Sequence, residues 1–217
     1  MRSAGTPPPE RLIESEPAAL TDVLGDQIEP MRRYADILCD RGVVWGLLGP
    51  KEPERIWTRH ILNCQALSPL IGAGASLIDV GSGAGLPGVV LALSRPDLEI
   101  VLLEPLLRRS DFLNLLVDEL GLAGRVQVVR ARSQEYRPAS PADVVVCRAV
   151  AGLSRLVEAT AHLFRTGQAL ALKGERAGLE IEAAEPVLRR YKLRAELSRP
   201  QLHPELEPAH VVRLRPA

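Results

Sequence analysis

Residues 77–88 of this 217-residue chain read Leu77-Ile78-Asp79-Val80-Gly81-Ser82-Gly83-Ala84-Gly85-Leu86-Pro87-Gly88. An apolar run ends at an acid, three glycines follow at alternate positions, and a proline precedes the apolar residues 89–93. This order predicts a strand, a tight turn and a helix, the arrangement with which doubly wound α/β sheets hold phosphates and nucleosides. Glycine permits positive φ and lets a ligand lie against bare main chain. We therefore expect a nucleotide-like cofactor at this turn.

Two cofactors match the turn. Residues 83–88 fit GxGxxG, the dinucleotide fingerprint. Counted from the strand, however, the pattern is Asp79-x-Gly81-x-Gly83-x-Gly85, with an acid before the first glycine. An acid there suits a ligand with an ammonium group, by direct or water-mediated contact, whereas a pyrophosphate gains nothing from it. We therefore favour S-adenosylmethionine over NAD(P), and the spacing is similar to motif I of the class I methyltransferases.

The rest of the chain predicts an α/β sheet around this turn. Strands and helices alternate from residue 76 onward, which is typical of a parallel sheet. The expected strands are 76–80, 99–104, 126–130, 143–148, 169–173, 192–197 and 210–215, and the main helices are 107–120, 153–164 and 178–190. Seven strands with an antiparallel last strand match a class I S-adenosylmethionine-dependent methyltransferase. We therefore expect that Rossmann-like, mostly parallel sheet, preceded by an N-terminal helical extension.

Three segments are expected. Residues 1–16 contain three consecutive prolines and no apolar signal segment, which predicts a disordered tail. Residues 17–75 carry apolar side chains at helical spacing, with breaks at Gly42 and 46–50 and a further helix over 54–67. Residues 76–217 form the methyltransferase domain, and no second domain of catalytic size follows.

Bulk properties limit the remaining possibilities. The formal net charge is zero, so no strong overall field attracts nucleic acid. Residues 148–217 hold twelve basic against eight acidic side chains, which suits a polyanionic substrate but also fits solvated helix faces. The three cysteines are far apart, so we expect no disulfide framework and no metal site, and a cytoplasmic protein. No apolar run reaches membrane-spanning length.

Polar residues at the expected strand ends are candidates for the site. Glu104 lies about 20 residues after the glycine turn, where an acid binds ribose hydroxyls of either cofactor. Ser133 and Gln134 follow the third strand, where adenine would lie. Arg148 ends the fourth strand and can bind the cofactor carboxylate or an RNA phosphate bidentately, unless it is a solvated surface arginine. Lys173 ends the fifth strand in the same way.

Missing motifs narrow the reaction. The chain has no Asn/Asp-Pro-Pro-Tyr/Phe run and no Pro-Cys dipeptide, which argues against exocyclic-amine methylation of that type and against cysteine attack on a pyrimidine. A ring nitrogen such as guanine N7 keeps an in-plane lone pair and needs no general base. We therefore assign no general base and expect catalysis by positioning, with Arg148 as the positioning residue.

Several runs together resemble a known family. They are Trp57-Thr58-Arg59-His60-Ile61-Leu62-Asn63, 78–88, Arg95-Pro96, Leu102-Leu103-Glu104-Pro105, 108–113, Arg148-Ala149-Val150-Ala151 and Ala171-Leu172-Lys173-Gly174-Glu175. The combination resembles the glucose-inhibited division protein B family, bacterial 16S rRNA guanine-N7 methyltransferases. The resemblance covers about residues 20–180. It departs from the family pattern at Arg108, where a lysine is common, and at Gln134, where an acid is common.

The resemblance implies a set of site residues. It places Gly81, Leu86, Ser133, Gln134 and Arg148 along the cofactor site. It also places Arg59, His60, Arg109, Arg132 and Lys173 on the surface that meets rRNA.

The resemblance also implies a function, namely methyl transfer from S-adenosylmethionine to guanine N7 in the decoding-region hairpin of 16S rRNA. The expected partner is 16S rRNA within a small-subunit assembly, with no membrane, no DNA and a monomeric enzyme. The alternatives are an NAD(P)-dependent oxidoreductase, which would need a substrate domain, and a non-catalytic RNA-binding protein on a methyltransferase fold.

Overall fold

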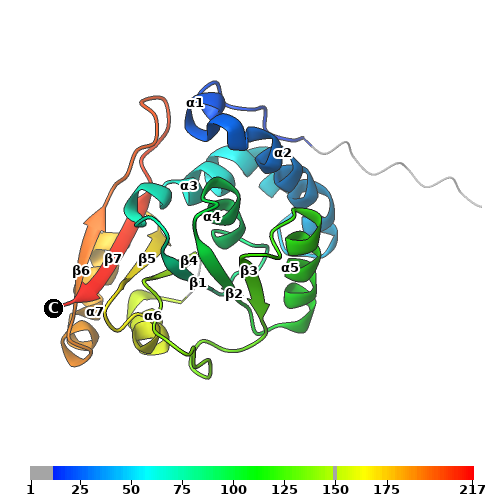
Figure 1. The fold of residues 1–217 in the computed structure, drawn as a ribbon. Coiled ribbons are helices and arrows are strands. Elements are labelled where there is room, and N and C mark those ends of the chain that lie inside the picture. The colour runs from blue at the N-terminus through cyan, green and yellow to red at the C-terminus, as the bar shows by residue number, and fades with distance from the viewer. Residues whose placement is uncertain (1–11, 149–150) are drawn as a thin grey trace, which may run out of the picture.

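The computed structural model describes residues 12–148 and 151–217, and within them seven strands form one sheet of order β3-β2-β1-β4-β5-β7-β6 (Figure 1). Neighbouring strands are parallel except where β7 pairs with β5 and β6. The strands are β1 Ser76–Val80, β2 Glu99–Leu103, β3 Val126–Val129, β4 Val144–Arg148, β5 Gln168–Lys173, β6 Leu193–Ser198 and β7 His210–Pro216. The expected seven-stranded sheet with an antiparallel last strand is confirmed.

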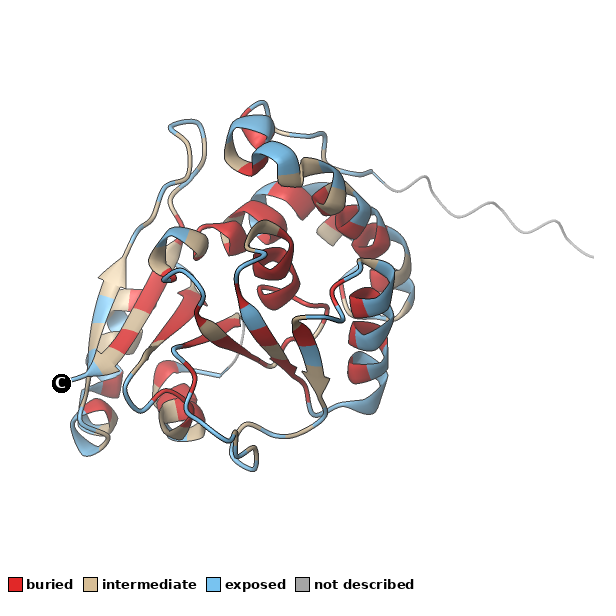
Figure 2. Ribbon diagram, viewed as in Figure 1, coloured by how far each residue is buried: buried red, intermediate tan, exposed pale blue. Residues whose placement is uncertain are grey.

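Helices cover both faces of this sheet. They are α4 Gly88–Ser94, α5 Leu107–Glu119, α6 Leu153–Thr160 with the 3-10 turn Ala161–Leu163, and α7 Ala177–Arg190. Side chains alternate between faces along a strand, so Leu77 packs with α4 and α5 while Ile78 packs with α6 and α7. Figure 2 shows buried residues along the inner strands and the helix sides that face them.

The N-terminal extension is helical, as expected, but it consists of short pieces. They are α1 Leu20–Leu24, a 3-10 turn Gly25–Gln27, α2 Ile28–Ile37, a π-helix Leu38–Gly42, a 3-10 helix Glu52–Arg55, a π-helix Ile56–Leu62, α3 Asn63–Gln65 and a 3-10 turn Ser68–Leu70. Met31, Tyr34 and Ile61 are fully buried and share one apolar cluster with α4 and β1. The extension and the sheet therefore have a common core.

The segment just before α1 contacts the extension. The Glu14 carboxylate accepts hydrogen bonds from the main-chain N–H groups of Trp57 at 2.7 Å and Thr58 at 3.1 Å. Glu16 pairs with Arg32, which lowers the pKa of Glu16 by a hydrogen bond. Residues 1–11 of the expected disordered tail lie outside the described residues. In the rest of that segment, these polar contacts hold Glu14 and Glu16.

The carboxyl ends of the parallel strands meet at one edge of the sheet, which is where ligands bind in open α/β folds. The glycine turn, Glu104, Arg148 and Lys173 all follow or end strands at this edge. In the part of the chain that the structure describes, no helix combines the length and apolar character needed to cross a membrane.

Candidate functional site

The turn between β1 and α4 has the conformation that its glycines predict. Gly81, Gly83 and Gly85 have φ of 73°, 55° and 97°, a region that favours glycine. A Cβ added at Gly83 would come no closer than 3.8 Å to any described atom outside its immediate chain neighbours, and that atom is the Gly81 carbonyl oxygen. The main chain at Gly83 is therefore open to a ligand.

Two contacts hold this turn from outside. The Tyr34 hydroxyl of α2 donates a 2.9 Å hydrogen bond to the Ala84 carbonyl. Glu104 directly follows β2 and is 1% exposed, and its Oε2 accepts a 3.0 Å hydrogen bond from Gly83 N. Its Oε1 accepts another from Leu106 N at 3.0 Å, at the start of α5. A ribose hydroxyl at Glu104 would have to use the remaining lone pairs of this carboxylate.

Asp79 lies under the turn and is fully buried. Its Oδ2 accepts a 2.9 Å hydrogen bond from Gly88 N, and a Cβ at residue 88 would lie 2.6 Å from the same oxygen. Its Oδ1 has no hydrogen-bond partner among the described residues. Burial raises the pKa of Asp79 to about 7. A buried carboxylate oxygen without a donor is costly, so the site suits a cationic ligand group such as the ammonium of S-adenosylmethionine.

The remaining expected cofactor residues differ in exposure. Ser133 and Gln134 lie in the turn after β3, where the Ser133 hydroxyl donates to Gln134 Oε1 at 3.3 Å. Ser133 is half-buried and Gln134 is exposed. The Leu86 side chain is 4% exposed and packs in the apolar cluster of the α4 face.

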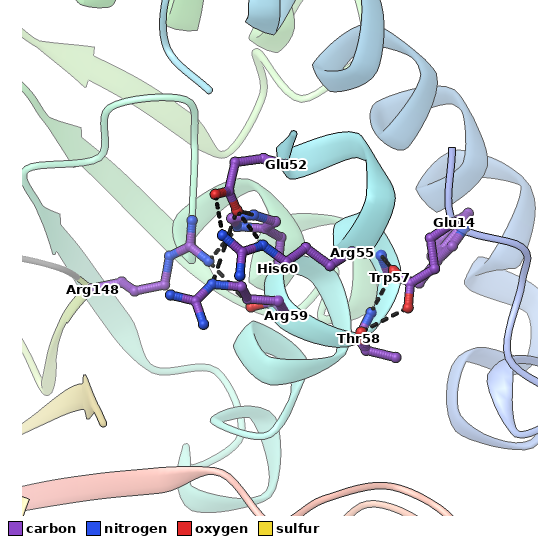
Figure 3. A network of polar contacts seen from close by, with 8 residues as sticks. All are labelled: Glu14, Glu52, Arg55, Trp57, Thr58, Arg59, His60 and Arg148. Carbon is purple, nitrogen blue, oxygen red and sulfur yellow. Dashed lines mark hydrogen bonds and ion pairs between the residues drawn. The ribbon is translucent and has the colours of Figure 1, made fainter. Parts of the chain in front are cut away.

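Arg148 is held by the extension rather than by the glycine turn (Figure 3). Its Nη1 lies 2.7 Å from His60 Nδ1 and 3.4 Å from the Arg59 carbonyl oxygen. The other ring nitrogen of His60, Nε2, lies 2.6 Å from Glu52 Oε2. Because a guanidinium only donates, Nδ1 must accept, and the ring proton is on Nε2 and is donated to Glu52. Burial, and after it the charge of Arg148, lowers the pKa of His60 to about 4, so the ring is neutral at physiological pH.

Two of the five expected rRNA-binding residues are not on an open surface. His60 is 5% exposed and both ring nitrogens are engaged, because its ring is turned into the interface between the extension and β4. The Lys173 side chain is 9% exposed and forms an ion pair with Glu180 Oε2 at 2.8 Å. Direct RNA contact of both residues stays a prediction. The other three, Arg59, Arg109 and Arg132, are exposed.

A cavity of about 600 Å³ lies at this edge, between the extension and the ends of β4 and β5. Among its lining residues are Leu48, Glu52, Arg59, His60, Asn63, Arg148, Lys173 and Glu180. The charge of Arg148, which lines this cavity, also lowers the pKa of Asp79 under the glycine turn. The cavity has the size of a small-molecule or nucleotide site and presents mostly charged and polar groups.

Sequence reasoning missed Tyr34, Glu52 and Glu180. The helical spacing of residues 17–75 predicts only that Tyr34 packs in the core, and both glutamates lie in polar stretches without a motif. Their partners are 50, 8 and 7 residues away, outside the residue's own helix in each case. No local pattern in the sequence signals such pairs.

Comparison with known proteins shows which protein family this chain resembles. The family model described as GidB, rRNA small subunit methyltransferase G, matches residues 27–201. The chain is 50% identical over 184 residues to Ribosomal RNA small subunit methyltransferase G of Mycolicibacterium gilvum, covering 84% of this chain and 78% of that protein. The protein of the same name from Streptomyces coelicolor is 50% identical over 174 residues, covering 79% of this chain and 72% of that one.

Solved structures with low sequence identity share the fold. The O-methyltransferase NcsB1 of neocarzinostatin biosynthesis, solved with S-adenosyl-L-homocysteine, matches with a TM-score of 0.60 at 16% identity, over 91% of this chain and 67% of that one. Precorrin-6y C5,15-methyltransferase from Geobacter metallireducens matches with a TM-score of 0.53 at 15% identity, over 72% and 86%. The expected class I methyltransferase fold is confirmed.

Proposed function

The chain belongs to the rRNA small subunit methyltransferase G family, and we propose on this basis that it transfers the methyl group of S-adenosylmethionine to guanine N7 in the decoding-region hairpin of 16S rRNA. The observation that carries the proposal is the polar cavity, lined by Arg148, at the same edge of the sheet as the glycine turn. This edge gives one place for a nucleoside cofactor and another for an acceptor base. Family membership sets aside the oxidoreductase alternative, and it favours an enzyme over a non-catalytic RNA-binding protein.

The residues at the strand ends suit S-adenosylmethionine, whose sulfonium supplies an electrophilic methyl group. Asp79 would take the ammonium group, because Oδ1 is buried without a donor. Glu104 would take the ribose, and Ser133 and Gln134 the adenine, at the neighbouring strand ends. The open main chain at Gly83 leaves room for the cofactor between these groups.

The cavity residues would hold the acceptor in line. Guanine N7 attacks through its in-plane lone pair, so the protein needs orientation and exclusion of water rather than a base. Arg148 would position the reactants, since the guanidinium lines the cavity and its charge acts on Asp79. Arg59, Arg109 and Arg132 are exposed and would contact phosphates around the target, which sets affinity and register.

We further propose that the substrate is 16S rRNA within a small-subunit assembly, that the enzyme acts as a cytoplasmic monomer, and that neither DNA nor a membrane is a partner. The family's substrate supports the small-subunit assembly and the location, because ribosomal subunits are assembled in the bacterial cytoplasm.

The test is methyl transfer to defined acceptors. Small subunits and naked 16S rRNA are prepared from a bacterial strain that lacks this methyltransferase and, as a control, from its parent strain. Incubation with the purified protein and S-adenosylmethionine should add 7-methylguanosine only to RNA from the deficient strain. Mass spectrometry of nuclease fragments should map it to the decoding-region hairpin. A methyl group on another atom or another helix, or no transfer to any acceptor, would contradict the proposal.

A further inference from the structure

Arg148 is fixed by a chain of hydrogen bonds that begins in the extension (Figure 3). We infer that His60 and Glu52 are positioning residues, which orient Arg148 so that its unused N–H donors bind an oxyanion in methyl transfer. That oxyanion is either a phosphate of the acceptor RNA or the carboxylate of the cofactor. The inference rests on the proposed function.

The hydrogen bonds leave one side of the guanidinium free. Both contacts of Arg148 use Nη1, at 2.7 Å to His60 and 3.4 Å to Arg59. Within residues 12–148 and 151–217, Nη2 and Nε have no hydrogen-bond partner. Arginine binds phosphate or carboxylate with two parallel N–H groups, so this unengaged pair of donors is suited to an oxyanion at the cavity that Arg148 lines.

His60 can hold the guanidinium only as a neutral acceptor. A protonated ring has no lone pair and would repel Arg148. Burial is the main cause that keeps the pKa of His60 near 4, and the charges of Arg148 and Arg59 lower it further, while Glu52 opposes them. The ring therefore presents Nδ1 as an acceptor at neutral pH.

Glu52 selects the tautomer that makes this possible. Its carboxylate accepts the Nε2 proton of His60 at 2.6 Å and a hydrogen bond from Arg55 Nε at 3.1 Å. The hydrogen bond from Arg55 is the largest cause that lowers the pKa of Glu52 to about 2, so it stays ionised. An ionised Glu52 requires a proton on Nε2, which leaves Nδ1 unprotonated for Arg148.

Two substitutions of His60 separate positioning from packing. The amide oxygen of His60→Asn lies near the place of Nδ1 and can still accept from Arg148. The amide nitrogen of His60→Gln lies near the place of Nε2, so this variant keeps the donor toward Glu52 and loses the acceptor. We expect kcat/KM for undermethylated small subunits to fall about ten- to a hundredfold in His60→Gln, the cost of one charged hydrogen bond. His60→Asn should retain clearly more activity.

Glu52→Gln should also lower kcat/KM, because an amide no longer enforces one tautomer. The matched control is Glu54→Gln, an exposed acid in the same 3-10 helix, which should behave like wild type.

The binding constants of the impaired variants identify the source of the oxyanion. A raised KM for RNA with an unchanged Kd for S-adenosylmethionine indicates phosphate, and a raised Kd for S-adenosylmethionine indicates the cofactor carboxylate.

Nitrogen NMR of histidine-labelled protein tests the geometry without an activity assay. His60, assigned by its loss in His60→Asn, should be the Nε2–H tautomer, and its Nδ1 shift should change in Arg148→Ala. Equal activity of His60→Gln and His60→Asn, whether normal or impaired, would overturn the inference, as would the Nδ1–H tautomer. If wild type transfers no methyl group, the proposed function fails, and the NMR result still judges the arrangement of His60 and Arg148.

Discussion

Tyr34 and Ala84 are 50 residues apart, and the tyrosine hydroxyl donates a 2.9 Å hydrogen bond to the alanine carbonyl. Tyr34 belongs to the N-terminal extension and Ala84 to the glycine turn, so the extension supports the turn at which we propose that the cofactor binds. Tyr34 is fully buried, and burial raises the pKa of its hydroxyl well above the usual value. It therefore remains a donor throughout the physiological range.

Tyr34→Phe tests this support. The substitution keeps the ring and removes the donor, so the Ala84 carbonyl is left unsatisfied at a cost of about 1–3 kcal/mol. We expect a lower melting temperature and weaker S-adenosylmethionine binding, measured by calorimetry. The control is Tyr136→Phe, at a half-buried tyrosine in the turn after β3. Unchanged cofactor affinity in Tyr34→Phe would mean that the turn keeps its shape without this bond.

Gly83→Val tests the open face of the turn. A branched side chain would occupy the ligand side and would be strained at φ 55°. We expect no measurable binding of S-adenosylmethionine or S-adenosylhomocysteine. Gly121→Val is the matched control, because Gly121 also has a positive φ, 68°, and open space around its Cβ position, but lies after α5. Both variants should lose stability, and only Gly83→Val should lose binding; retained binding would place the cofactor elsewhere.

Asp79→Asn tests whether the buried carboxylate is kept for a ligand. The unfolded carboxyl has a pKa of about 3.8 and the folded one about 7, so between these values the folded state binds the proton. Stability then falls as pH rises through this window. The amide of Asp79→Asn cannot ionise, so the variant does not lose stability as the pH rises. We therefore expect its melting temperature to be several degrees above that of wild type at pH 8.5, and the difference to be much smaller at pH 5. It should also bind S-adenosylmethionine more weakly. An equal difference in melting temperature at both pH values would contradict the assignment.

Arg109→Ala tests the RNA surface. Each phosphate contact that is lost should reduce the salt dependence of RNA binding by roughly one unit of slope. We expect this for Arg109→Ala, with S-adenosylmethionine affinity unchanged. Arg189→Ala, at an exposed arginine of α7, should leave the slope as in wild type. Lys173→Met should lower stability, since Lys173 is paired with Glu180. An unchanged slope in Arg109→Ala would remove it from the interface.

Prediction from sequence succeeded where the cause is local. The glycine turn and the strand ends follow from a few consecutive residues, and parallel pairing then brings Asp79, Glu104 and Arg148 to one edge of the sheet. It did not foresee the burial of His60, whose partner Arg148 is 88 residues away. Whether a polar side chain faces solvent or a distant partner depends on how the extension packs on β4. The split of the expected helix 54–67 into 3-10, π and α pieces likewise has no signal in its spacing.

The double attachment of the glycine turn, to Glu104 at Gly83 and to Tyr34 at Ala84, has a kinetic consequence. A loop that must order around its ligand loses conformational entropy at each encounter, and a loop already fixed does not. We therefore expect the rate of cofactor capture to depend on diffusion into the crevice rather than on closure of the loop. Selectivity among nucleosides should then arise from differences in their dissociation rates.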